Sequence, residues 1–144
     1  MSTPASGPEY RKPLPSLGDE ITAPYWRAAA ERRLALPRCE DCGLTFFYPR
    51  RACPSCWSER IEWIDAAGTG RVWSFTWVHV PFYDDAWKDD VPYCVAIVEL
   101  DEGVRLVSSL EGVEPGQVAV GDAARVVFDA VTDEVVLPRF EVLR

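Results

Sequence analysis

Four of the five cysteines stand in two close pairs, and their spacing constrains the fold of this chain more than any other feature. Cys39 and Cys42 form the first pair and Cys53 and Cys56 the second, in the pattern C-x2-C-x10-C-x2-C. Two intervening residues allow a tight turn to aim both sulfurs at one ion, and two such turns joined by a hairpin complete a tetrahedron. The spacing therefore predicts a zinc ribbon.

The expected zinc ion has a structural role. Four thiolates close the coordination shell and leave no position for water or substrate. A rubredoxin-like iron site uses the same ligands and is the alternative, but nothing else in the sequence indicates redox chemistry. Disulfides are disfavoured because the N-terminus has no hydrophobic region of the signal-peptide kind.

Composition divides the chain into four segments. The first is rich in Pro, Ser and Gly, the second is rich in alanine, the third holds the cysteine pairs, and the fourth alternates strands with turns. We expect an extended arm (1–18), a helical segment (19–36), the zinc ribbon (37–65) and an OB-fold domain (66–144).

The alanine-rich segment carries signals for a helix start. Thr22 can cap the N-terminus, Pro24 suits the first turn, and three alanines follow at 28–30. These signals predict a helix from Thr22 to about Leu36. Its apolar stripe is expected to pack on the rest of the chain, or to line a ligand groove or a subunit interface.

The fourth segment reads as an all-β domain. Five strands are predicted, at Arg71–Val80, Tyr93–Leu100, Val104–Leu110, Ala124–Ala130 and Glu134–Val142. A long first strand and a non-strand connection between the third and fourth are typical of a small OB-type barrel, with a β-sandwich fragment as the alternative. The expected fold is therefore mostly β: an N-terminal helix, a rubredoxin-like zinc ribbon and a five-stranded OB-fold barrel.

The net charge of −8 lies entirely in the second half. Residues 66–144 hold six Lys/Arg and fourteen Asp/Glu, whereas residues 1–65 hold nine of each. Trp73, Phe75 and Trp77 alternate along the first barrel strand and are expected to share one face, where aromatic rings can stack bases. Because nucleic-acid affinity depends on cationic side chains, this acidic half favours a barrel core or a subunit contact instead.

Two side chains with catalytic potential occur in the barrel, Cys94 and His79. Cys94 lies in an apolar run and is expected to be a small buried hydrophobe, and His79 a structural histidine. A nucleophilic Cys94–His79 pair is the alternative, but no third residue to orient it is evident. The chain also lacks a phosphate-binding Gly-rich loop and a nucleophile elbow, so it reads as a binding or scaffolding module.

Two further groups are candidates for binding. Arg50 and Arg51 can hold phosphates while Phe47 covers a planar group, or they are ordinary surface charges. Phe82, Tyr83 and Trp87 are large aromatics in an acidic loop, where exposed apolar surface is typical of a partner interface. The acidic residues of this loop are read as a solvated surface, because their spacing does not match an EF-hand; they are Asp84, Asp85, Asp89 and Asp90.

The order of parts resembles the acyl-CoA-associated zinc-ribbon/OB-fold family, long catalogued as domain of unknown function thirty-five. The stretches that carry the resemblance are DEITAPYWRAAAERRLAL, LALPRCEDCGLTFFYPRRACPSCWSERIEWIDAAGTGRVWSFTWVHVPF, PYCVAIVELDEGVRLVSSLEG and ARVVFDAVTDEVVLPRFEVL. All four ribbon cysteines of the family are kept. The resemblance covers nearly everything after residue 13.

The resemblance implies a non-catalytic, acyl-CoA-associated subunit of a thiolase-superfamily enzyme. The setting we favour is an aldolase that cleaves a steroid side-chain β-hydroxyacyl-CoA, with a heterotetramer as the expected assembly. The alternatives are a thiolase/HMG-CoA synthase complex, in which such a protein bridges two enzymes, or an enoyl-CoA hydratase. Outside this class, the alternatives are a single-stranded nucleic-acid-binding OB protein and a stand-alone enzyme.

A cytoplasmic location is expected. No apolar run approaches the ~20 residues that a membrane span requires, and the first residues lack a secretory signal. We therefore expect a protein partner and acyl-CoA, with neither a membrane nor a nucleic acid as partner.

Overall fold

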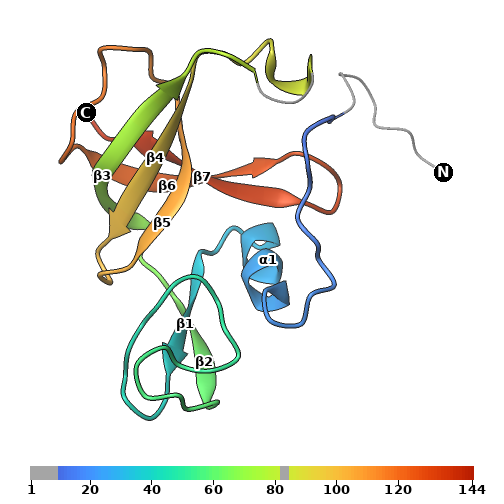
Figure 1. The fold of residues 1–144 in the computed structure, drawn as a ribbon, viewed down its shortest axis with the longest axis vertical. Coiled ribbons are helices and arrows are strands. Elements are labelled where there is room, and N and C mark those ends of the chain that lie inside the picture. The colour runs from blue at the N-terminus through green and yellow to red at the C-terminus, as the bar shows by residue number, and fades with distance from the viewer. Residues whose placement is uncertain (1–9, 82–84) are drawn as a thin grey trace.

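The computed structural model describes residues 10–81 and 85–144, and it separates a two-stranded ribbon from a larger barrel. In Figure 1 the barrel lies at the top and the ribbon at the bottom, with helix α1 (Ala23–Ala30) beside them. Helix α1 contacts the first ribbon strand and the last barrel strand, so it braces the junction between the two parts.

Helix α1 is shorter than the sequence signals suggested, and the predicted end near Leu36 is wrong. Thr22 takes the N-cap position without a side-chain capping bond, and the last helical residue is Ala30. Arg32 then adopts a positive φ of 63°, which ends the helix. Leu36 instead lies in strand β1 (Ala35–Cys39), fully buried, because the chain here enters the ribbon sheet.

The ribbon sheet pairs β1 antiparallel with β2 (Ile61–Asp65). The register places Cys39 opposite Ile61, so the first cysteine stands at the end of the sheet nearest the metal cluster. At the other end, the N–H of Ala66 donates to the carbonyl of Leu34, which ties the ribbon base to the start of the barrel.

The barrel consists of five strands that close in the order β3-β4-β5-β7-β6. Their bounds are β3 Thr69–Val78, β4 Tyr93–Leu100, β5 Arg105–Glu111, β6 Ala123–Ala130 and β7 Val136–Val142. β5 and β7 are parallel and the other neighbours antiparallel. The mostly-β fold with an OB-type barrel is thus confirmed. A short 3-10 helix, η1 (Asp85–Trp87), lies between β3 and β4.

The barrel core extends into the base of the ribbon. One continuous cluster holds Phe140, which is fully buried, together with inward side chains of β3, β4 and β5. Leu34 and Leu36, from the segment before the first cysteine pair, belong to the same cluster. Ribbon and barrel are therefore joined by shared apolar packing. Among the described residues, no helix is long and apolar enough to span a membrane.

The aromatic residues of β3 do not share one face, contrary to the alternation expected from the sequence. Val72 is buried in the core, and a β-bulge shifts the register between Val72 and Ser74. The extra residue reverses the alternation, so Phe75 and Trp77 pack against the core while Trp73 is 45% exposed. Only two of the three rings therefore help to fill the barrel.

Candidate metal centre and its surroundings

The four ribbon cysteines converge on one point. Their sulfur atoms all lie within 4.8 Å of one another. The Sγ atoms of Cys39 and Cys56 are 3.5 Å apart, and those of Cys42 and Cys53 are 3.6 Å apart. Four sulfurs at the corners of one small cluster are the donor set of a closed tetrahedral zinc site.

Backbone hydrogen bonds shape each cysteine pair into the same turn. In the first turn, the N–H of Gly43 donates to the carbonyl of Cys39 at 3.0 Å. In the second, the N–H of Trp57 donates to the carbonyl of Cys53 at 2.9 Å. The first cysteine of each pair is buried and the second is exposed. The two turns, called knuckles below, are thus near copies of each other.

The local electrostatics differ among the cysteines of the cluster. The backbone N–H of Cys42 lowers the pKa of the Cys39 thiol to about 6, against the opposing effect of burial. The pKa of Cys56 is raised to about 12: the N–H of Ser58 acts to lower it, but the contacts with the other cysteine sulfurs, Cys39 first, and burial together outweigh that effect. A divalent cation bound by the four sulfurs would displace their protons.

The arginines expected to hold phosphates line a small cleft on the ribbon. Arg51 is paired with Glu20 at 2.8 Å, and the Arg50 side chain is exposed beside it. The cleft has a volume of about 250 Å³, and its apolar wall consists of Ile21, Ile61 and Trp63. This wall was not expected from the sequence, although the apolar–polar–apolar alternation of Ile61-Glu62-Trp63 was a signal for it. Glu20 partly neutralises the site, so an anion would have to displace it from Arg51.

Phe47 faces a different cleft from the two arginines. Its ring is partly buried, with ring centroids 5.3 Å from Tyr25 and 4.7 Å from Tyr48. These rings line an apolar groove of about 190 Å³ that reaches Leu106 and Val107 of β5. Burial raises the pKa of Tyr25. The three predicted ligand residues are thus divided between two neighbouring clefts.

Of the aromatic loop, only Trp87 can be placed, because Phe82, Tyr83 and Asp84 lie outside the described residues. Trp87 is partly buried, and its ring stacks on Tyr93 with centroids 5.1 Å apart. Lys12 of the N-terminal arm places its Nζ 5.0 Å from the Trp87 ring and pairs with Asp90. The arm therefore lies against the loop.

Cys94 and His79 occupy contrasting environments. Cys94 is 1% exposed, and burial raises the pKa of its thiol, which makes it a poor nucleophile. His79 is exposed and follows the end of β3. The structure thus gives no support to a nucleophilic pair.

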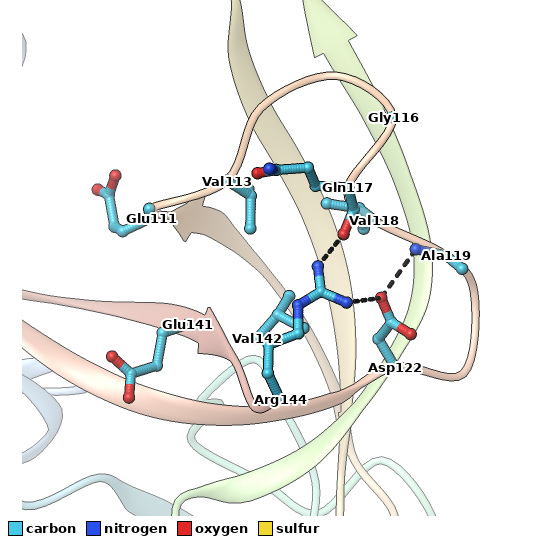
Figure 2. A pocket seen from close by; sticks show the side chains of 11 residues that line it. Glu111, Val113, Gly116, Gln117, Val118, Ala119, Asp122, Glu141, Val142 and Arg144 are labelled. Atoms are coloured by element: carbon cyan, nitrogen blue, oxygen red, sulfur yellow. Dashed lines mark hydrogen bonds and ion pairs between the residues drawn. The ribbon is translucent and has the colours of Figure 1, made fainter.

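A further cavity lies on the barrel beside the C-terminal Arg144, and no sequence signal indicated it. Figure 2 shows Arg144 reaching across it to the carbonyl of Gln117 and the carboxylate of Asp122. The cavity measures about 660 Å³, and Glu111 and Glu141 also line it. Its arginine is already paired and its other charges are acidic, so it does not suit a phosphate ligand.

A four-cysteine ribbon joined to a closed five-stranded barrel defines a zinc-ribbon/OB-fold protein. The family model "ChsH2, rubredoxin-like zinc ribbon domain" matches residues 26–62, and "ChsH2, C-terminal OB-fold domain" matches residues 63–129. A DUF35 domain-containing scaffold protein of Methanothermobacter thermautotrophicus is 36% identical over 115 residues, which cover 78% of this chain and 85% of that protein. This chain belongs to the ChsH2-type DUF35 family, and its structural zinc site is confirmed.

A solved structure and two longer proteins are also similar. The structure titled "Ltp2-ChsH2(DUF35) aldolase" matches with a TM-score of 0.78 and 35% identity, over 86% of this chain and 95% of that one. A probable enoyl-CoA hydratase alpha subunit of Thermomonospora curvata is 35% identical over 92% of this chain, which spans 40% of that subunit. The 3-oxo-4,17-pregnadiene-20-carboxyl-CoA hydratase alpha subunit of Mycobacterium tuberculosis is 32% identical over 74% of this chain, which spans 33% of it.

Proposed function

We propose that this chain is a non-catalytic, acyl-CoA-associated subunit of a thiolase-superfamily aldolase. The observation that carries the proposal is the similarity over 95% of the matching chain in the Ltp2-ChsH2(DUF35) aldolase. The described residues favour a non-catalytic role, because four cysteines close the zinc site and Cys94 is buried with a raised thiol pKa. The catalytic groups then belong to the partner, in a cytoplasmic hetero-oligomer for which we expect a heterotetramer.

The proposed substrate is a steroid side-chain β-hydroxyacyl-CoA. In the retro-aldol step, the bond between Cα and Cβ breaks, the β-hydroxyl loses its proton to become a carbonyl, and Cα gains a proton. The relative from Mycobacterium tuberculosis, named for a pregnadiene carboxyl-CoA, supports a steroid acyl group. The other relative of this kind, a probable enoyl-CoA hydratase alpha subunit, supports hydratase association as the second candidate.

For the CoA moiety, we propose the two clefts on either side of residues 20–22 and 48–51. Arg50 and Arg51 would hold phosphate oxygens, and the apolar groove beside Phe47 would take an uncharged part of the ligand. The ribbon half has no excess negative charge, whereas the barrel half carries −8. The loop of Phe82, Tyr83 and Trp87 is proposed as a contact of the partner subunit.

The test is an assay of the chain alone and of its complex with a candidate thiolase-superfamily subunit. Cleavage of a steroid β-hydroxyacyl-CoA is expected only from the complex, with release of a ketone and a shorter acyl-CoA. Hydration of an enoyl-CoA in place of cleavage would support the hydratase alternative. Cleavage by the isolated chain, or strong salt-dependent binding of single-stranded nucleic acid, would contradict the proposal.

A further inference from the structure

The second zinc knuckle carries a tryptophan where the first carries a glycine. Gly43 and Trp57 each follow the second cysteine of their pair, and each donates its N–H to the carbonyl of the first cysteine. Both residues adopt the left-handed conformation, with φ of 79° for Gly43 and 67° for Trp57. The two positions are therefore equivalent in backbone structure, and only the side chains differ.

This position disfavours a tryptophan. Glycine reaches positive φ without a steric penalty, whereas a bulky side chain there strains the backbone. Strain of this kind persists where the side chain gains something elsewhere, and it occurs often at functional sites. The Trp57 side chain gains little within the chain, because it is 79% exposed. That is the highest value among the exposed large hydrophobic residues of the described parts of the chain.

A partner outside the chain therefore accounts for Trp57. Tryptophan is enriched among the few residues that dominate protein interfaces, where it fills an apolar recess and excludes water. In the free subunit most of the same indole therefore lies in water. The position therefore combines strain and exposure in the free chain with the residue type best suited to an interface.

The charges near Trp57 indicate what that partner is. Glu59, Glu40 and Asp41 lie close in the chain or in the adjoining knuckle, and Arg60 is the neighbouring cation. Arg60 is already bound to Asp41 at 2.7 Å. Four thiolates around a divalent zinc add a further net negative charge. A phosphate-bearing ligand such as CoA or a nucleic acid is repelled here, whereas a protein recess with a basic rim is attracted.

We propose that Trp57 is an interface anchor, which inserts into an apolar, basic-rimmed recess of the thiolase-superfamily subunit. The inference rests on the proposed function, since it names a surface through which that complex forms. It places a second docking contact, besides the proposed Trp87 loop, at the tip of the second knuckle, separate from the proposed CoA clefts beside Arg50 and Phe47.

Trp57→Gly tests the proposal because stability and assembly should change in opposite directions. Removing the strained side chain should raise the melting temperature of the zinc-loaded chain by relieving the backbone. It should also weaken binding to the co-expressed thiolase-superfamily subunit by about thirtyfold or more. Trp57→Phe should keep the backbone strain and retain part of the affinity.

Gly43→Ala is the matched control at the equivalent position. A Cβ there has space, with the nearest side-chain atom of Arg38 at 4.0 Å, so only the backbone conformation is tested. This variant should lower the melting temperature, keep its zinc and assemble normally. That result would show that a side chain at this positive-φ position strains the backbone, and that a change at a zinc knuckle does not by itself weaken assembly.

Each other outcome overturns a specific claim. If Trp57→Gly assembles like the wild type, the anchor is wrong while the proposed function stands. If Trp57→Gly lowers the melting temperature, the side chain packs within the chain and the strain argument fails. If acetyl-CoA binds the isolated chain and Trp57→Gly abolishes that binding, the residue stacks on a nucleotide instead. If the wild-type chain binds no thiolase-superfamily subunit, the proposed function and the anchor fall together.

Discussion

In the barrel, five strands close around a cluster of buried side chains, whereas the ribbon has two strands and few large buried groups. Phe140, Val98 and Leu100 are almost wholly inaccessible to solvent in the barrel. Between residues 40 and 65, only Phe46 and Cys53 are buried hydrophobic residues. The barrel can therefore be stabilised by burial alone, whereas the ribbon depends on a metal ion to hold its two knuckles together.

The comparison also shows how the two parts depend on each other. Leu34 and Leu36 lead into the first knuckle, yet they pack in the barrel cluster. Unfolding of the ribbon would therefore expose one side of the barrel core, whereas a defect deep in the barrel need not disturb the sulfur cluster. The following predictions test this asymmetry.

Loss of the metal should have the largest effect. Cys56→Ser removes one of four ligands, and structural zinc contributes on the order of 10 kcal/mol of folding free energy at neutral pH. We expect loss of the zinc measured by elemental analysis, and a ribbon that unfolds together with the packing of α1. The barrel should remain folded with a lower melting temperature. A Cys56→Ser protein with unchanged zinc content and melting temperature would contradict a ribbon held by metal.

A cavity in the barrel should be the next largest perturbation. Phe140→Ala removes a fully buried ring, and such truncations cost about 3–5 kcal/mol of unfolding free energy. The zinc content should stay at that of the wild type, because the sulfur cluster does not involve β7. Denaturant unfolding together with zinc analysis checks both expectations. Loss of zinc from this variant would show that the two parts unfold as one cooperative unit.

The sequence predicted the barrel better than it predicted its details. Strand β4 has the predicted bounds of Tyr93–Leu100, because a short apolar run between Pro92 and the Asp101-Glu102-Gly103 turn marks it clearly. The bulge at Trp73 was not predictable, since an extra residue in one strand leaves no mark in a single strand's composition. The prediction that Trp73 shares a face with Phe75 and Trp77 is therefore wrong.

Helix signals were misleading at the junction with the ribbon. Arg32 and Leu34 fit a helical pattern, yet Arg32 adopts positive φ and Leu34 enters the core. The packing of Leu34 on the barrel, and not local helix propensity, determines where the helix ends. Cysteine spacing, in contrast, was enough for the metal cluster, because four ligands at one ion leave few geometries. The clefts lined by Arg50 and by Phe47 depend on which segments lie side by side, which spacing does not show.

A substitution in the loop that holds Trp87 should have a smaller effect in free energy, and it should act on assembly with the partner more than on folding. Trp87→Ala is expected to weaken binding to the catalytic subunit about tenfold or more, because burying such a ring contributes roughly 1.5–3 kcal/mol. Since Trp87 also stacks on Tyr93, a small decrease in melting temperature is expected as well. Titration of the catalytic subunit measures the affinity, and excess subunit should restore activity. Normal assembly of this variant would remove the loop from the interface.

The smallest expected effect concerns the charge contrast between the two halves. Arg50→Glu with Arg51→Glu should weaken acyl-CoA binding to the complex by roughly three- to tenfold, because exposed charges act through screened attraction. The melting temperature should change little, since both side chains are exposed and the Arg51–Glu20 pair is solvated. Arg125→Glu is the matched control: it breaks an exposed pair with Glu141 on the acidic barrel. Equal losses from both variants would mean that overall charge acts, whereas a loss confined to the ribbon variant would place the phosphates at Arg50 and Arg51.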